Sequence, residues 1–86
     1  LASVSFAGDA AAGKAKSMTC AGCHGANGIS NNPMWPNLAG QKQAYLASAL
    51  QMYRDGRRKN AMMTAMAKNL TDADIANLAA YYSGLK

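Results

Sequence analysis

Cys20-Ala21-Gly22-Cys23-His24 is the segment from which most of this chain can be interpreted. Cys-x-x-Cys-His is the attachment sequence of haem c. Residues i and i+3 share one side of a helical turn, so the thiols of Cys20 and Cys23 can both reach the vinyl groups of one porphyrin and form thioethers. His24 follows directly, and its neutral imidazole can bind iron. The segment therefore predicts one haem c, covalently bound through two thioethers, with His24 as a metal ligand.

Other uses of the two cysteines are disfavoured by the rest of the sequence. A structural zinc site usually has four ligands in two separated pairs, whereas both cysteines and the only histidine lie in this one segment. A thioredoxin-like dithiol belongs in a strand–helix–strand context, and no strand-rich stretch flanks the motif. A disulfide between Cys20 and Cys23 would close a very small loop and leave His24 without a function.

Length and composition predict one small domain. The chain has 86 residues, too few for two independent cores, and a domain of this size often needs an additional stabilising element such as a covalent cofactor. No run of eighteen or more apolar residues is present, so we expect no integral membrane segment. The net charge of +5 suits protein partners with acidic docking faces. Nucleic acid is not an expected partner, because the basic residues are not interleaved with aromatic ones.

The first seven residues, Leu1 to Ala7, allow two interpretations. Small Ser5 and Ala7 stand where a signal peptidase would cleave, which makes 1–7 the remnant of a secretory signal peptide. The alternative is an ordinary, flexible N-terminus. The domain itself is expected to span residues 8–86.

The first predicted helix covers residues 10–19 and runs directly into the haem motif. Asp9 is a favourable N-cap for it. Gly13 inside this helix indicates either a close crossing of another helix or simple tolerance of one glycine. The next segment, 25–38, is rich in glycine, asparagine and proline, and we expect it to be a loop that wraps the edge of the haem.

Two more long helices are predicted. Apolar residues recur on one face over 41–55, and Gly56 ends this helix. Residues 60–70 are expected to contain a short helical turn. Thr71-Asp72-Ala73-Asp74 has the pattern of a capping box, and the apolar face of the last helix follows at helical spacing, with Ile75, Leu78, Ala79 and Tyr82. The pattern indicates an all-α fold.

Features outside the motif are candidates for contact with the haem. The carbonyl groups of the loop that contains Pro36 are free to accept a hydrogen bond from His24. Trp35 either packs on the haem, with its indole N–H toward a propionate, or is a plain core aromatic. The densest basic run is either a solvated corner or a surface for docking and propionate pairing; it consists of Arg54, Arg57, Arg58 and Lys59.

The position opposite His24 on the iron is left to methionine, lysine, water or no ligand, because the chain has a single histidine. Met18 is too close in sequence to reach the opposite face of the haem, and Met52 is expected to pack in the core. Chain length alone does not exclude Met34. The better candidates precede the last helix in a segment with little other apolar content; they are Met62, Met63 and Met66. At most one of them is expected to bind iron, because methionines at helical spacing are more often core residues.

The sequence resembles the class I cytochromes c, in particular the small bacterial branch, over nearly its whole length. The resemblance rests on Gly-Asp-Ala-Ala-Ala-Gly before the haem motif, Cys-Ala-Gly-Cys-His-Gly at the motif, and Trp-Pro-Asn-Leu-Ala-Gly-Gln after it. It continues with Tyr45-Leu46, with Met63 ahead of Leu70-Thr71-Asp72, and with the run from Asp74 to Tyr82. The whole is similar to one half of the two-haem periplasmic cytochromes of the same branch.

The resemblance implies the class I cytochrome c fold, in which three to five helices wrap around one haem and the N- and C-terminal helices cross. In related chains the ligand methionine stands a fixed number of positions before the Ser/Thr that caps the last helix. Counting back from Thr71 implies Met63 as the second metal ligand, with its neighbour Met62 as the alternative.

The resemblance also implies roles for three residues outside the motif. Pro36 matches the proline whose carbonyl accepts the histidine proton. Arg58 matches a basic position near the haem propionates, and Trp35 replaces other aromatic residues found there. The implied cofactor-binding set is Cys20, Cys23, His24, Trp35, Pro36, Arg58 and Met63.

On these grounds we expect a soluble one-electron carrier of a bacterial respiratory or related periplasmic chain, and not an enzyme. Its partners are expected to be redox proteins, and the carrier itself a monomer. The alternative is a haem domain or subunit of a larger membrane oxidase or dehydrogenase. A haem enzyme or gas sensor with open iron is disfavoured, because peroxidase-type chemistry requires a distal acid–base group such as a second histidine. Because the sequence stops at Lys86, we expect either a monohaem protein or one half of a two-haem protein.

Overall fold

Five α-helices form the part of the chain that the computed structural model describes, which is residues 8–33, 35–58 and 60–85 without the side chain of Cys23. In chain order the helices are α1 (Ala10–Lys16), α2 (Met18–His24), α3 (Gln43–Arg54), α4 (Ala61–Ala67) and α5 (Asp72–Ser83). No strand occurs among the described residues, so the all-α prediction is confirmed. The interpretations of Leu1–Ala7 and of Met34 as an alternative ligand lie outside these residues.

The helices that the structure describes are short. The longest, α3 and α5, have 12 residues each, whereas crossing a bilayer takes about 20 apolar residues. Within the described ranges, therefore, no helix is a candidate for a membrane span.

The first predicted helix is interrupted at Ser17, where a turn separates α1 from α2. Asp9 caps α1 as predicted, because its carboxylate accepts from two of the first backbone N–H groups of the helix. The hydroxyl of Ser17 donates a hydrogen bond of 2.7 Å to the carbonyl oxygen of Lys14. A serine hydroxyl that bonds to the preceding turn competes with the regular helix pattern and bends the helix. The prediction of one continuous helix over 10–19 is therefore wrong at this residue.

α1 and α5 cross at Gly13. A Cβ atom at Gly13 would overlap the carbonyl oxygen of Asn77 and lie 2.8 Å from the Cβ of Tyr81. Only a residue without a side chain lets two helix backbones approach this closely. Of the two interpretations of Gly13, the close crossing is confirmed, and with it the predicted contact between the N- and C-terminal helices.

α5 supplies most of the hydrophobic core. Its N-terminus is fixed by the predicted capping box, in which the Thr71 hydroxyl accepts from the Asp74 N–H and the Asp74 carboxylate accepts from the Thr71 N–H, each at 3.0 Å. The predicted apolar positions are all buried; they are Ile75, Leu78, Ala79 and Tyr82. Together with Leu46 and Ala47 of α3, they form one core cluster.

α3 ends in the turn predicted at Gly56. Gly56 has a φ of 77°, and its N–H and that of Arg57 donate to carbonyls of the last turn of α3 at 3.2 and 2.9 Å. This is the Schellman arrangement, which satisfies the final carbonyls of a helix. The chain then enters α4, whose N-cap Asn60 accepts from the backbone N–H of Met63 at 3.1 Å.

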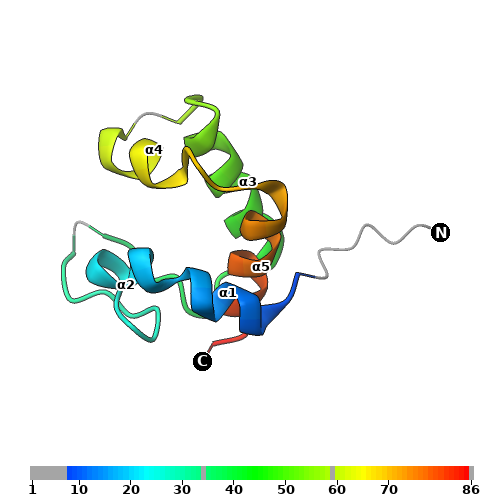
Figure 1. The fold of residues 1–86 in the computed structure, drawn as a ribbon. Helices are drawn as coiled ribbons and strands as arrows, with labels where there is room; N and C mark the ends of the chain where they lie inside the picture. The colour runs from blue at the N-terminus through cyan, green and yellow to red at the C-terminus, as the bar shows by residue number, and fades with distance from the viewer. Residues whose placement is uncertain (1–7, 34, 59, 86) are drawn as a thin grey trace.

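The helices carrying the haem motif and the methionine cluster lie on one side of the fold. Figure 1 shows α2 and α4 on the same side, apart from each other, while α3 and α5 join them on the opposite side. α3 packs against both α4 and α5, and α1 packs against α5. The haem motif on α2 and the methionine cluster on α4 thus lie on two helices that are separate from each other (Figure 1).

Candidate haem site

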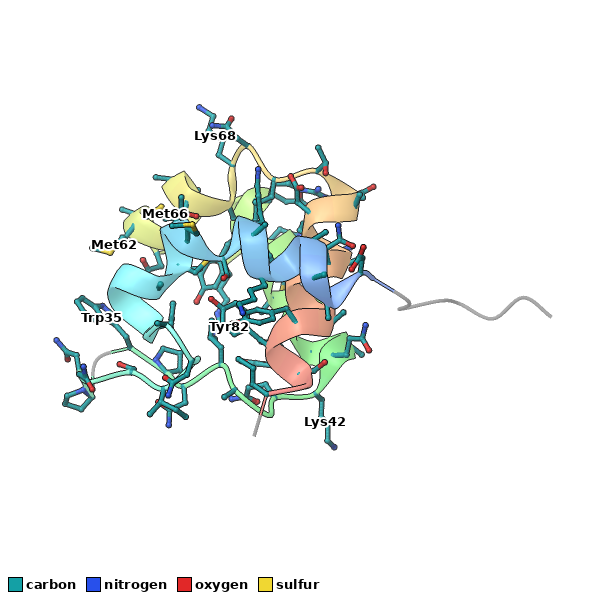
Figure 2. All side chains as sticks on the ribbon, turned by 60° about the horizontal axis from the view of Figure 1, so that its bottom comes forward. Trp35, Lys42, Met62, Met66, Lys68 and Tyr82 are labelled. Atoms are coloured by element: carbon teal, nitrogen blue, oxygen red, sulfur yellow. The ribbon has the colours of Figure 1, made fainter. Side chains whose placement is uncertain are left out.

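α2 to α5 and the segment between α2 and α3 together line a cavity of about 370 Å³. This volume falls in the range typical of cofactor sites. Most of the lining side chains are apolar or aromatic. Figure 2 shows Met62 and Met66 on α4, Trp35 in the loop after α2, and Tyr82 near the centre of the molecule. Segments that are far apart in the sequence therefore contribute to one site.

His24, the last residue of α2, is buried and lines this cavity. Its Nδ1 lies 2.8 Å from the carbonyl oxygen of Pro36. Because a carbonyl oxygen can only accept, Nδ1 carries the proton, and Nε2 keeps the lone pair that a metal requires. The predicted hydrogen bond from His24 to the following loop is confirmed, and its acceptor is Pro36.

The helical spacing of the two cysteines is confirmed for the backbone, because residues 20 and 23 both lie within α2. Cys20 is half-buried and lines the cavity. The side chain of Cys23 is outside the described atoms, so its thioether remains a prediction. α2 ends at Gly25, whose φ of 86° turns the chain sharply into the following loop.

α4 contributes all three methionines of the predicted cluster to the cavity. Met63 is less exposed than Met62 and Met66, which are 53% and 47% exposed. Met18 is 79% exposed on α2. Met63 as the iron ligand stays a prediction that rests on its spacing to Thr71, with Met62 as the alternative.

Arg58 lines the cavity together with two tyrosines of α3 that were not predicted as site residues. Its guanidinium carbon lies 4.9 Å from the ring centre of Tyr53, a cation–π distance. A side-chain hydrogen bond with Tyr45 is the main cause that raises the pKa of Arg58 above its ordinary value. Both tyrosines lie on the apolar face of the second predicted helix. A hydroxyl group on an otherwise apolar side chain is the feature of the sequence that could have indicated a position at the edge of a cavity.

Trp35 and Tyr82 complete the aromatic part of the lining. Trp35 is half-buried and lines the cavity, and its packing on the cofactor stays a prediction. Tyr82 is only 3% exposed, and its hydroxyl is hydrogen-bonded to the side chain of Ser17. Burial raises the pKa of Tyr82 above its ordinary range, so this phenol stays neutral at the floor of the site.

The residues around the cavity fit a haem c. The apolar walls suit a flat apolar macrocycle, and Cys20 on α2 is positioned at the wall for a thioether. The imidazole of His24 is held in the tautomer that binds iron. α4 offers thioether sulfur, and Arg58 offers a cation for an anionic propionate.

A family model described as cytochrome c matches residues 10–86. The chain belongs to the cytochrome c family. Cytochrome c-554(548) of Halomonas halodenitrificans is 55% identical over 80 residues, which cover 90% of this chain and 96% of that protein. Cytochrome c4 of Pseudomonas aeruginosa is 48% identical over 80 residues, which cover 93% of this chain and 40% of that protein. The crystal structure of reduced recombinant cytochrome c4 from Pseudomonas stutzeri has a TM-score of 0.88 at 42% identity, and the match covers 93% of this chain and 47% of that one.

This cytochrome c has the class I fold that the sequence predicted. It carries haem c, and the size of the chain and the cavity fit one haem. Its relatives are electron carriers, and electron transfer is the function of this domain. The chain spans almost all of cytochrome c-554(548), but only about half or less of the length of the cytochrome c4 proteins that it matches.

Proposed function

We propose that this cytochrome c carries single electrons between redox proteins, and that His24 and Met63 would be the two protein ligands of the iron of one haem. The observation that carries the proposal is the bond between His24 Nδ1 and the Pro36 carbonyl, in a cavity that the methionines of α4 also line. Haem c supplies an iron that accepts one electron to become Fe(II) and releases it to become Fe(III). His24 and Met63 would both hold the iron in either oxidation state, so that the ligand set would stay the same when the charge changes.

His24 and Met63 have different tasks in this proposal. Pro36 holds the proton on Nδ1 of His24, which orients the ring and increases the electron donation of Nε2. Met63 offers a soft sulfur that favours Fe(II) and raises the reduction potential. The apolar lining excludes water and also raises the reduction potential, because it disfavours the extra positive charge of Fe(III).

The mouth of the cavity is the proposed site of electron exchange. Several lining side chains are also exposed, among them Met62, Met66 and Tyr45. Exposed methionines are adaptable apolar contacts, and they suit a small and short-lived interface. A partner that covers these residues would come close to the cofactor without a permanent complex.

The charge of the chain supports partners with acidic docking faces. All four acidic residues are engaged within the chain: Asp9 accepts from the α1 N-terminus, Asp55 from Arg57, Asp72 from Arg54 and Asp74 from Thr71. Lys42 and Lys68 project from opposite ends of the molecule (Figure 2). With its net charge of +5, the chain attracts negatively charged partners, and encounters with them are faster at low ionic strength.

We infer a periplasmic carrier that acts as a monomer and catalyses no reaction of its own. Relatives that are bacterial c-type cytochromes support the periplasm. The alternative of a haem domain within a larger oxidase or dehydrogenase predicts co-purification with a membrane complex, which fractionation of cells tests.

Acid–acetone extraction followed by a redox titration tests the proposed function. The pigment is expected to stay with the polypeptide, and its absorbance is expected to titrate reversibly as a one-electron couple. The ferrous protein is expected not to bind carbon monoxide, because His24 and Met63 would leave no open site on the iron. Extraction of the pigment, or rapid binding of carbon monoxide by the native protein, would contradict the proposal.

A further inference from the structure

The helix that carries Met63 is weakly supported by its own sequence. α4 has only seven residues, and an isolated helix of that length is not stable in water. It packs against α3, and at its end Ala67 is fully buried. The position of Met63 therefore depends on contacts that the flanking segments make with the rest of the fold.

Arg54 makes such contacts from the last turn of α3. Its Nη1 donates to the carbonyl oxygen of Leu70 at 3.2 Å and to the carboxylate of Asp72 at 2.8 Å. Its Nε lies 3.5 Å from the carboxylate of its neighbour Asp55. Leu70 directly precedes the cap of α5 and packs against the core cluster. One side chain thus joins the end of α3 to the beginning of α5.

The two longer contacts close a loop around the methionine helix. They connect residues 16 and 18 positions apart, and the enclosed chain contains the Gly56 turn, the Asn60 cap and all of α4. A segment tied at both ends has less freedom to move away from the site that it faces. Without this tie, the enclosed segment would be held by the packing of α4 on α3 and by the burial of Ala67 and Leu70.

We propose that Arg54 is a positioning residue that holds α4, and with it the sulfur of Met63, against the haem site. The inference rests on the proposed ligation by Met63. The carboxylate of Asp72 is 84% exposed, and such surface ion pairs contribute little to the global free energy of unfolding. The bond to the Leu70 carbonyl is part-buried and fixes backbone. The effect of Arg54 is therefore expected on local opening of the segment rather than on unfolding of the whole chain.

The test compares Arg54→Gln with Arg57→Gln in the oxidised holoprotein. Both variants lose one positive charge from the same corner, but Arg57 bonds to Asp55, which is only two positions away and does not bridge two helices. The readouts are the rate at which added cyanide replaces the sulfur ligand, and the temperature at which the long-wavelength absorption band of sulfur-ligated ferric haem disappears. Far-ultraviolet circular dichroism records the unfolding of the helices in the same samples.

Arg54→Gln is expected to bind cyanide at least about fivefold faster than wild type, as the loss of a bond to a charged group implies. It should lose the sulfur band at a lower temperature while the helices unfold at nearly the wild-type temperature. Arg57→Gln should match wild type in all three readouts. Arg54→Lys keeps the charge but not the planar fork, and should fall between wild type and Arg54→Gln.

Two results would overturn the inference while leaving Met63 as the ligand. In the first, the wild-type protein shows the sulfur band, and cyanide binds to Arg54→Gln and Arg57→Gln at equal rates. The other is loss of the band and of the helices at the same lowered temperature, which would make Arg54 a residue of general stability. A wild-type protein without the sulfur band would overturn both this inference and the proposed ligation. If Arg54→Gln does not yield holoprotein, Arg54→Lys is compared with Arg57→Gln instead, and equal cyanide rates in these two variants again reject the inference.

Discussion

The carbonyl oxygen of Pro36 accepts a hydrogen bond of 2.8 Å from Nδ1 of His24, across 12 positions of the chain. The loop that carries Pro36 is itself fixed, because the N–H groups of Leu38 and Ala39 both donate to the carbonyl oxygen of Gly28, at 2.8 and 3.1 Å. The fixed φ of proline adds to this rigidity. The loop therefore holds the acceptor in position for His24.

Replacing Pro36 by alanine is expected to raise the reduction potential of the holoprotein. The looser loop weakens the bond to His24, a less polarised imidazole donates less to the iron, and Fe(II) is favoured. Stability should fall by roughly 0.4–1 kcal/mol, because alanine gives the unfolded chain more freedom. Pro33→Ala in the same loop is the control, with a similar loss of stability and an unchanged potential. A potential that falls, or that shifts equally in both variants, would argue against this role of Pro36.

Gly13→Ala is expected to destabilise the protein by roughly 1–3 kcal/mol, although alanine normally favours a helix. The added methyl group would overlap the carbonyl of Asn77 and force α1 away from α5. Gly22→Ala in α2 is the matched control, because nothing lies within 4 Å of a Cβ atom there. It should be neutral or stabilising by up to about 1 kcal/mol. The free energies of unfolding are measured by denaturant titration followed by circular dichroism. An equal gain in stability in both variants would disprove the close crossing.

Asp74 makes stability depend on pH in the acid range. The hydrogen bond from the Thr71 backbone, with a smaller contribution from Lys16 at 3.6 Å, holds the pKa of Asp74 below its ordinary value. A carboxylate whose pKa is lowered by folding stabilises the fold above its unfolded pKa, and this contribution is lost as pH falls through the folded pKa. The free energy of unfolding of wild type should therefore exceed that of Asp74→Asn by roughly 0.3–1 kcal/mol above about pH 5. This difference should shrink toward zero in stronger acid. A difference that grows on acidification would contradict the assignment.

Arg58→Gln is expected to lower the reduction potential. A positive charge beside the site destabilises Fe(III) relative to Fe(II). Its loss should reduce this preference for Fe(II) by on the order of 1 kcal/mol, which lowers the reduction potential by roughly 40 mV for one electron. Lys14→Gln removes the same charge from α1, which contributes no lining residue to the cavity, and should shift the potential much less. Equal shifts in the two variants would mean that Arg58 acts only through net charge.

Local signals in the sequence predicted the elements that depend on neighbouring residues. The Thr71–Asp74 capping box and the turn at Gly56 each need only a few adjacent positions, and both form as expected. The buried face of α5 follows from helical spacing alone. The haem motif is equally local, since its five residues lie in or at the end of one helix.

Features that depend on tertiary contacts were not predictable in the same way. Ser17 is buried in the fold, and its hydroxyl bonds to the preceding turn instead of to water, which the neighbouring residues alone do not indicate. Arg54 was assigned to an exposed basic run, yet its partners lie far along the chain and only the fold brings them together. The positions of Tyr45 and Tyr53 beside Arg58 arise for the same reason.

The absorption spectrum of the oxidised holoprotein, recorded for wild type, Met63→Ala and Met62→Ala, examines the proposed iron coordination in one experiment. Wild type and Met62→Ala are expected to show the long-wavelength band of sulfur ligation, and Met63→Ala is expected to lack it and to have a lower reduction potential. Retention of the band in Met63→Ala with its loss in Met62→Ala would move the ligand by one residue. Absence of the band in wild type would contradict the His24–Met63 site altogether.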